Sequence, residues 1–210
     1  MVSGEFLTAL FKSQSGSHEI STMLKQMAME IAESGQVPAY CNDIIQWLLA
    51  HWKEFVFDQH ACRICQVIFK EPMYWRQRDY IIDNEIMGHI VQLSQEKYGS
   101  HIIEIAIKFS SPIYLTKIFN EILYGYKPLY EPEAHPNAPP LSALEVIMFD
   151  QFGNYVFQHL YRAAEDVRNS IRPGDARWLY MLDCAINRNH HKLRRLTHGR
   201  QILKSKHFVN

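Results

Sequence analysis

The sequence has little of several features that define other protein classes. Its 210 residues include four cysteines, nine glycines and nine prolines, too few for a disulfide scaffold or a low-complexity chain. Its apolar runs are short: even 44–50 is interrupted by Gln46, whereas a membrane-spanning helix needs ~20 apolar residues. The N-terminus lacks a basic segment followed by an apolar one. We therefore expect no secretory signal and reduced cysteines.

An excess of charge of one sign is also missing, because 22 Lys and Arg balance 22 Asp and Glu. A net charge of zero disfavours a nucleic-acid partner, which ordinarily leaves a basic excess. The charges are unevenly distributed, however. Residues 184–210 contain seven basic and no acidic side chains, and the rest of the chain has 15 basic against 22 acidic. The neutral total is thus the average of two unlike regions and excludes no class of partner.

What the sequence does have is an apolar content of 47%, which favours a folded chain over a disordered one. Apolar residues recur at helical spacing across Asp43–Phe57 and across 113–123, where Ser111 and Pro112 form an N-cap and N1 pair. No segment alternates as a strand does. These patterns predict an all-α protein, either a bundle or a solenoid of stacked repeats.

An internal repeat favours the solenoid. Five segments begin with a small residue, followed by two polar or aromatic residues, two further residues and a polar residue. They are Gly16–Ser21, Ala61–Gln66, Gly99–Glu104, Gly153–Gln158 and Gly199–Lys204. Their small residues are 45, 38, 54 and 46 positions apart, which is the size of a stacked helical unit. We divide the single domain 1–210 into units 1–41, 42–73, 74–111, 112–172 and 173–210.

The motif has a geometric consequence on a helix. Asn154 and Gln158 are four residues apart and share a face, whereas Val156 and Phe157 point back into the array. We expect Asn154 and Gln158 to protrude together. Such a face would suit flat ligands that form hydrogen bonds.

At these residues the sequence resembles the Pumilio/FBF (PUF) family of RNA-binding proteins, in particular its FBF-like, nematode-type branch. The resemblance implies a right-handed, armadillo-like superhelix of about four pumilio-type repeats, where the family usually has eight. Unit 1–41 is then a degenerate repeat, and 173–210 is a C-terminal cap that reads no base. In this family each repeat reads one base of single-stranded RNA on the concave face.

The resemblance also implies which residues bind RNA. The first and fifth residues of a family signature contact the base edge, and the second residue stacks. The implied RNA-binding residues are Cys62, Arg63 and Gln66 for adenine, Ser100, His101 and Glu104 for guanine, and Asn154, Tyr155 and Gln158 for uracil. Because the family binds RNA antiparallel, they would read 5′-UGA.

The chemistry of the side chains agrees with this assignment. A carboxylate can accept both donors of a guanine edge, and an amide offers the donor and acceptor that adenine or uracil needs. Ser17 and His18 would be weaker contacts, because Ser21 stands where the family has Glu or Gln.

The implied function is binding of messenger RNA 3′ untranslated regions in the cytoplasm, with repression of translation or mRNA decay through recruited proteins. Protein partners would bind the convex face and the Pro- and Tyr-rich insertion 124–141, which would contribute Tyr126, Leu129 and Tyr130. No cofactor, metal, membrane or catalytic activity is expected. The alternative is a shortened paralogue that binds little or no RNA and acts as a protein-interaction solenoid.

The motifs also have a purely structural interpretation. Polar residues at i and i+4 can simply line a solvated face. Cys62 and Cys65 have metal-site spacing, but no second pair accompanies them, and helical geometry places Cys65 toward the core. The sequence has no Gly-rich phosphate loop and no metalloprotease motif.

Overall fold

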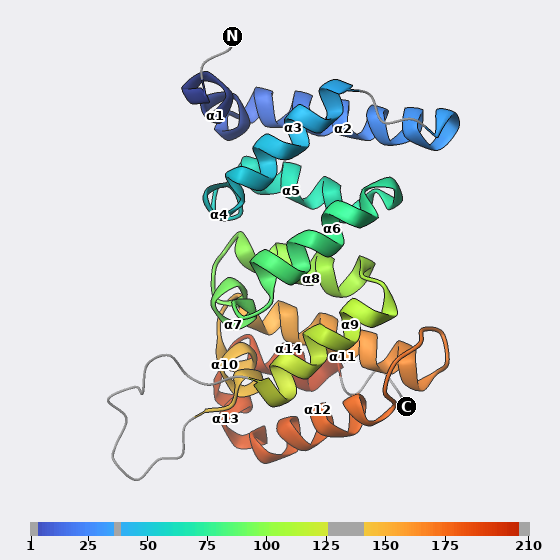
Figure 1. Ribbon diagram of the computed structural model, residues 1–210. Helices are drawn as coiled ribbons and strands as arrows, with labels where there is room; N and C mark the ends of the chain where they lie inside the picture. Colours follow the sequence, from blue (N-terminus) through green and yellow to red (C-terminus); the bar gives the residue numbers. More distant parts are fainter. Residues whose placement is uncertain (1–3, 36–38, 126–140, 206–210) are drawn as a thin grey trace.

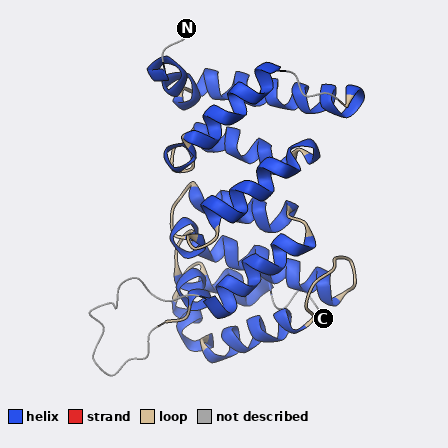
Figure 2. Cartoon of the chain, in the orientation of Figure 1, coloured by secondary structure: helices blue, strands red, loops and turns tan. Residues whose placement is uncertain are grey.

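The chain folds as a stack of helices, as the periodicity predicts (Figures 1 and 2). The computed structural model describes residues 4–35, 39–125 and 141–205, and these contain helices and turns but no strand. The prediction of an all-α repeat fold is confirmed. None of the described helices combines the length and apolar character needed to cross a membrane.

Three kinds of helix alternate along the chain. Short helices come first in each triplet: α1 Gly4–Lys12, α4 Trp52–Phe55, α7 Ile90–Ser94, α10 Ala143–Phe149 and α13 His190–Arg195. The helices that carry the repeated motif, here called the signature helices, come second: α2 Gln14–Ser34, α5 Ala61–Lys70, α8 Gly99–Phe109, α11 Gly153–Arg168 and α14 Gly199–Ser205. Third helices follow: α3 Ala39–Ala50, α6 Trp75–Ile81, α9 Pro112–Asn120 and α12 Arg177–Arg188.

The remaining helical turns extend these elements. A 3₁₀ turn, Pro72–Tyr74, precedes α6, and π-helical turns, Ile82–Ile86 and Glu121–Gly125, continue α6 and α9. Helix α9 begins at Pro112 after Ser111, as predicted, although Ser111 makes no side-chain capping bond.

The signature helices lie side by side through the whole array. α2 contacts α5, α5 contacts α8, α8 contacts α11, and α11 contacts α14. Figure 1 shows α3, α6 and α9 in front of this row, with the short helices along one edge. The third helices begin at Ala39, Trp75, Pro112 and Arg177, and the predicted units begin at residues 42, 74, 112 and 173.

One predicted helix is wrong. Residues 43–57 form two helices, with a corner at His51 (φ −111°, ψ 18°). The corner is needed because α3 ends one triplet and α4 begins the next, where Trp52 and Phe55 turn into the core. The His51 ring stacks on Trp47 at 4.0 Å and on Phe55 at 5.7 Å between centroids. Because the stacked rings are four residues apart, the sequence keeps helical spacing across the corner although the helix is interrupted there.

The small residue of each motif is explained by a close backbone approach. Where it is glycine, an added Cβ would lie well inside contact distance of the carbonyl oxygen six residues earlier. These distances are 2.2 Å for Gly16, 2.7 Å for Gly99, 2.5 Å for Gly153 and 2.3 Å for Gly199. The signature helix therefore starts directly against the end of the short helix before it. Ala61 takes the equivalent place in α5 and is fully buried.

In α2, α5 and α11, the side chain three residues before the small residue caps the helix start. Asp150 Oδ1 accepts hydrogen bonds from the N–H groups of Phe152 (2.7 Å) and Gly153 (2.8 Å). Asp58 caps α5 in the same way at 2.8 Å, and Ser13 accepts from the N–H of Gly16 at 3.0 Å. These bonds satisfy N–H groups that have no partner inside the helix.

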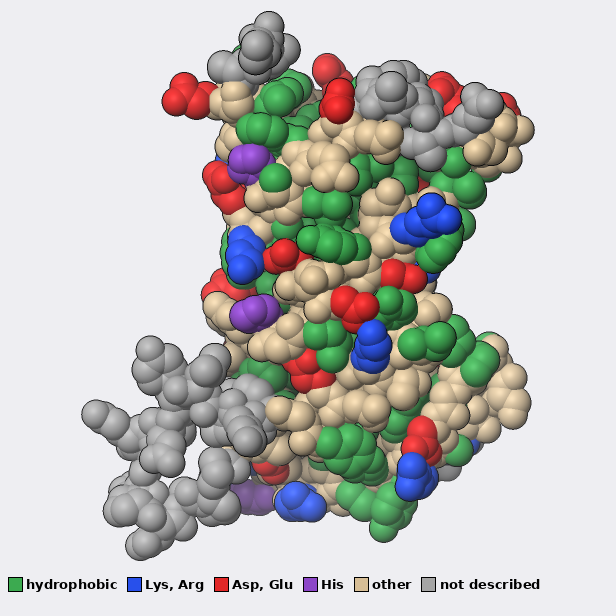
Figure 3. Space-filling view, in the orientation of Figure 1, with side chains coloured by type: hydrophobic (Ala, Val, Ile, Leu, Met, Phe, Trp, Pro, Cys, Tyr) green, Lys and Arg blue, Asp and Glu red, His purple; other side chains and the backbone are tan. Residues whose placement is uncertain are grey.

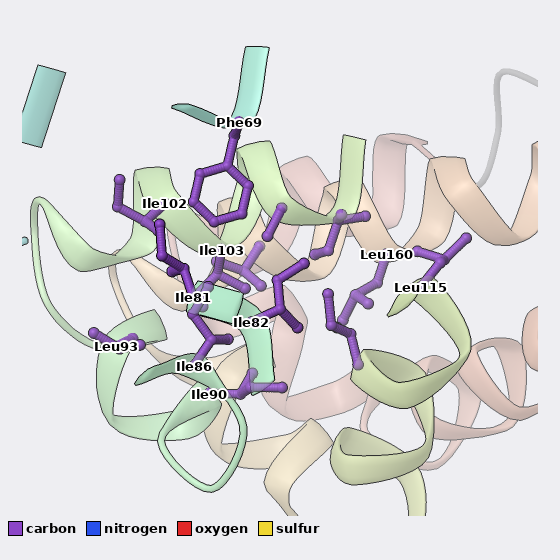
Figure 4. Close-up of a cluster of buried hydrophobic side chains, with 14 of the residues drawn as sticks. Phe69, Ile81, Ile82, Ile86, Ile90, Leu93, Ile102, Ile103, Leu115 and Leu160 are labelled. Carbon is purple, nitrogen blue, oxygen red and sulfur yellow. The ribbon is translucent and has the colours of Figure 1, made fainter. Parts of the chain in front are cut away.

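A continuous apolar core runs through the stack. Figure 4 shows isoleucines and leucines from α6, α7, α8, α9 and α11 meeting between the helices. Val156 and Phe157 are completely buried, which confirms the predicted inward face of the motif, and Cys65 is buried as expected.

Polar contacts also tie neighbouring units together. The guanidinium of Arg172 donates to the carbonyls of Ile107 (2.7 Å) and Ser110 (2.6 Å). Arg78 donates to the carbonyl of Phe109 at 3.0 Å. One cation from before α8 in the chain and one from after it therefore cap the C-terminal end of α8, where the helix dipole favours positive charge.

The close approach at Gly153 can be tested by Gly153→Ala. We expect a loss of about 1–3 kcal/mol in the free energy of unfolding, because the added Cβ meets a backbone carbonyl that cannot easily move. Gly125→Ala is the control, since its Cβ would meet only atoms at 3.8 Å or beyond. Urea denaturation measures both. Equal stability of the two variants would contradict the packing explanation.

Candidate nucleic-acid interface

The first residue of each signature points inward and makes the same hydrogen bond. It donates to the backbone carbonyl three residues earlier, and it is at most 3% exposed. The bonds are Ser17 to Gln14 (3.1 Å), Cys62 to Gln59 (3.6 Å), Ser100 to Lys97 (3.1 Å) and Asn154 to Gln151 (2.7 Å). The first signature position thus closes the turn that leads into its helix.

The expectation that Asn154 and Gln158 protrude together is therefore wrong for Asn154. Its side chain is fully buried, and its Nδ2 lies 3.3 Å from the carbonyl of Asp150 as well as bonding Gln151. Its Oδ1 accepts a hydrogen bond from Nε2 of Gln158 at 3.2 Å. The two side chains are adjacent as predicted, but only Gln158 reaches the surface.

The second signature residues face outward. His18, Arg63, His101 and Tyr155 are all exposed, Tyr155 by 47%. The fifth residues are half-buried beside them, and these are Ser21, Gln66, Glu104 and Gln158. Flat side chains thus alternate with polar groups along the row of signature helices, a surface that we call the signature face. Flat side chains can stack on bases while polar groups meet base edges.

A polar groove of about 640 Å³ runs over α2, α5 and α8 on this face. It brings together the predicted contacts of three units: Ser17, His18, Cys62, Arg63, Gln66 and His101. Ser21, Lys25, Lys70, Lys97, Gln59 and Tyr98 also line it, although sequence reasoning did not assign them to the site. Tyr98 donates a hydrogen bond to Oε1 of Gln59 at 3.4 Å, which links α5 to the turn before α8.

Glu104 lies between two histidines from different units. Its Oε1 is 3.3 Å from Nδ1 of His101, and its Oε2 is 3.7 Å from Nδ1 of His159. Glu104 Oε1 is buried yet accepts no hydrogen bond from a described residue. The carboxylate therefore keeps acceptor capacity for a ligand. His159 was not predicted, because its proximity to Glu104 arises only when α8 and α11 pack together.

The cysteine pair is part of the packing. Burial, and secondarily the charge of Asp58, raises the pKa of Cys62 to about 11, so its thiol stays protonated and can donate to the Gln59 carbonyl. Burial raises the pKa of Cys65 as well. Within residues 4–35, 39–125 and 141–205, no group of three or more His, Cys, Asp or Glu is placed to hold a metal ion.

Two further predicted regions lie at the C-terminal end of the array. In α14, Arg200 stands at the first signature position but is exposed, unlike its four counterparts. Tyr126, Leu129 and Tyr130, the predicted partner-binding residues, lie outside the described residues. Tyr124, at the start of the insertion, is 61% exposed, and its hydroxyl is 3.1 Å from Sδ of Met181.

The buried role of Asn154 predicts a stability effect. Asn154→Ala should lower the free energy of unfolding by about 1–3 kcal/mol, because it removes a fully buried side chain that bonds to two backbone carbonyls. Gln158→Ala should cost less, since Gln158 is half-buried and bonds only to Asn154. Thermal or urea unfolding distinguishes them, and an undestabilised Asn154→Ala would show that this side chain is not structural.

The comparison with known proteins agrees with this repeated geometry. The family model for the Pumilio-family RNA binding repeat matches residues 51–71, 89–123 and 146–168. Each matched segment contains all or most of a short helix and its signature helix.

Two proteins of Caenorhabditis elegans are similar to the chain in sequence. The chain is 29% identical over 163 residues to Fem-3 mRNA-binding factor 1 of Caenorhabditis elegans, which covers 73% of this chain and 25% of that protein. It is 29% identical over 142 residues to Pumilio domain-containing protein 5 of the same organism, covering 63% of this chain and 24% of the relative. The chain thus spans about a quarter of the length of these relatives.

A solved structure, PUF-6 in complex with 5BE13 RNA, superposes with a TM-score of 0.77 at 22% identity. The match covers 95% of this chain and 54% of PUF-6. PUF-8 in complex with PBE-RNA superposes with a TM-score of 0.63 at 15% identity. These likenesses establish the fold of the array. The matched repeats and the relatives in sequence show that the chain belongs to the Pumilio/FBF family of helical-repeat proteins.

Proposed function

We propose that the signature face binds single-stranded RNA, with one base held by each well-formed unit. The observation that carries this proposal is the alternation of exposed flat side chains with half-buried polar groups on α5, α8 and α11. Three relatives of the same fold are named as RNA complexes, PUF-6, PUF-8 and Puf3. A base stacked between successive second residues would turn its edge toward the fifth residue.

The bases follow from the fifth residues and from the family resemblance. Glu104 would accept both donors of guanine, and its buried Oε1 lacks a hydrogen-bond donor among the described residues. Gln66 and Gln158 offer amide edges for adenine and uracil. Since the family binds RNA antiparallel, the element is 5′-UGA. With the first signature residues buried, the fifth residues would provide most of the base-edge contact.

The RNA would be a messenger, bound in its 3′ untranslated region in the cytoplasm. Relatives named as Fem-3 mRNA-binding factors and a Puf3 complex with a Cox17 3′ UTR site support this assignment. Repression or decay would then come from recruited proteins. The basic C-terminal region, with Arg188, Lys192, Arg194, Arg195 and Arg200 exposed, would attract the phosphates at the RNA 5′ end.

One observation favours a second function, protein binding without RNA. Large apolar side chains are exposed on the third helices: Trp75 by 50%, Tyr80 by 51%, Ile113 by 70% and Tyr180 by 72%. Figure 3 shows apolar side chains scattered over the face formed by these helices. Exposed aromatic residues are common contacts in protein interfaces. Three bases at about 1–3 kcal/mol each would also give only modest RNA affinity.

RNA binding with base discrimination separates the two functions. We expect tighter binding of a short RNA containing 5′-UGA than of the same RNA with 5′-UAA, measured by fluorescence anisotropy. Glu104→Gln should reduce this discrimination by roughly 10- to 100-fold, the equivalent of about 1–3 kcal/mol for a paired base contact. The glutamine amide accepts a hydrogen bond only at its oxygen, and its NH₂ group repels the second N–H donor of guanine.

Glu96→Gln is the matched control, because Glu96 is exposed just before α8 and outside the signature. It makes the same change of charge and should leave discrimination unchanged. Equal affinity of the wild-type protein for both RNAs would reject base reading and favour the protein-binding alternative.

A further inference from the structure

A second row of charged residues accompanies the signatures. Eight positions after the first signature residue, each of the four helices α2, α5, α8 and α11 has a cation. These cations are Lys25, Lys70, Lys108 and Arg162, and all four are exposed. The recurrence is independent of the residues that the repeats use for base edges.

Helical geometry places these cations beside the signature. Residues at i, i+4 and i+8 lie on one face, so each cation is one turn beyond the fifth signature residue. Because the signature helices contact one another in order, the cations form a row parallel to the base-edge groups. Lys25 and Lys70 line the same groove as Ser21 and Gln66, which confirms this placement for two helices.

The three lysines are close enough to affect one another. Burial, and then the charges of Lys25 and Lys108, lowers the pKa of Lys70. None of the three forms an ion pair with a carboxylate of the described chain. Like charges held together without counter-charges are unfavourable, and an anionic ligand would relieve that repulsion.

Arg162 differs from the lysines because acidic neighbours surround it. Glu165 and Asp166 follow it on α11, and the charge of Arg162 acts on the pKa of Glu165. The effective row therefore consists of Lys25, Lys70 and Lys108.

Two of the cations on the third helices have carboxylate partners. Lys117 pairs with Asp83 at 2.6 Å, and Arg78 lies 3.6 Å from Asp79. Figure 3 shows basic and acidic side chains interspersed on the face formed by the third helices. Cations without such partners thus recur in register on the signature face, which is the arrangement expected for a polyanion that crosses the helices.

We propose that Lys25, Lys70 and Lys108 bind successive backbone phosphates of a single-stranded nucleic acid, one helical turn from the groups that meet its bases. The proposal rests on the proposed function, because it assigns the phosphates of the strand whose bases lie on the signatures. The row repeats at the spacing of packed helices, about 8–10 Å. Lys70 also donates to Oε1 of Gln66 at 3.2 Å, which leaves the Nε2 hydrogens of Gln66 for a base edge.

The test is the salt dependence of RNA binding by the double variant Lys25→Gln with Lys108→Gln. Lys70 is left intact because it contacts Gln66. For the 5′-UGA RNA, the slope of log K against log salt should fall in magnitude by about 1.4, from about 0.7 for each phosphate contact to a single strand. Affinity should fall roughly tenfold at 0.15 M salt. Discrimination between 5′-UGA and 5′-UAA should stay unchanged.

The matched control is Lys53→Gln with Arg76→Gln, which removes two exposed cations from α4 and α6 outside the groove. It should leave the slope at the wild-type value. Glutamine suits helices about as well as lysine, so both variants should keep the wild-type thermal midpoint.

The outcomes separate the two proposals. Equal slopes for the double variant and the control, with wild-type discrimination present, overturn the phosphate row alone. A lysine-dependent slope without discrimination supports the row and overturns base reading. A wild-type protein that binds neither RNA overturns both.

Discussion

The start of each signature helix depends on one backbone approach. A small residue lies against a carbonyl in the last turn of the preceding short helix, and a Cβ built on Gly153 would be 2.5 Å from the carbonyl oxygen of Ile147. This contact fixes how the two helices cross and therefore the rotation of the signature helix about its axis. With that rotation fixed, the next residue turns inward, the following one turns outward, and the fifth lies half-buried between units. The same approach is found at Gly16, Gly99 and Gly199, and a fully buried alanine, Ala61, takes the equivalent place in α5.

The rotation couples the stability of the helix start to the surface that the motif exposes. Asn154 and its counterparts are at once the first residues of the family signature and buried donors to the turn before the helix. Their side chains therefore hold the motif in place, while the second and fifth residues supply the accessible surface. Glu104 shows the same coupling between units, since its environment depends on His159 from the next signature helix.

The two faces of the stack have different electrostatics although the chain has no net charge. Third helices hold cations beside carboxylates, and their exposed apolar side chains are interspersed with both. Signature helices α2, α5 and α8 hold Lys25, Lys70 and Lys108 in register, without carboxylate partners among the described residues. The average over the chain hides this difference, because a net charge records how many charges there are but not which face carries them. The position of a charged residue within the repeat is therefore more informative about binding partners than the charge composition of the whole chain.

Most helices, the repeat and the inward side of the motif could be predicted from the sequence, because helical spacing fixes the relative directions of residues such as Val156 and Phe157. Three features depend on packing between units: Asn154 is enclosed, residues 43–57 turn a corner at His51, and Glu104 lies beside His159. Spacing along one helix gives angles between side chains, but it cannot show which neighbouring backbone or helix fills the space they point into. Those neighbours are set by the stacking of units distant in sequence.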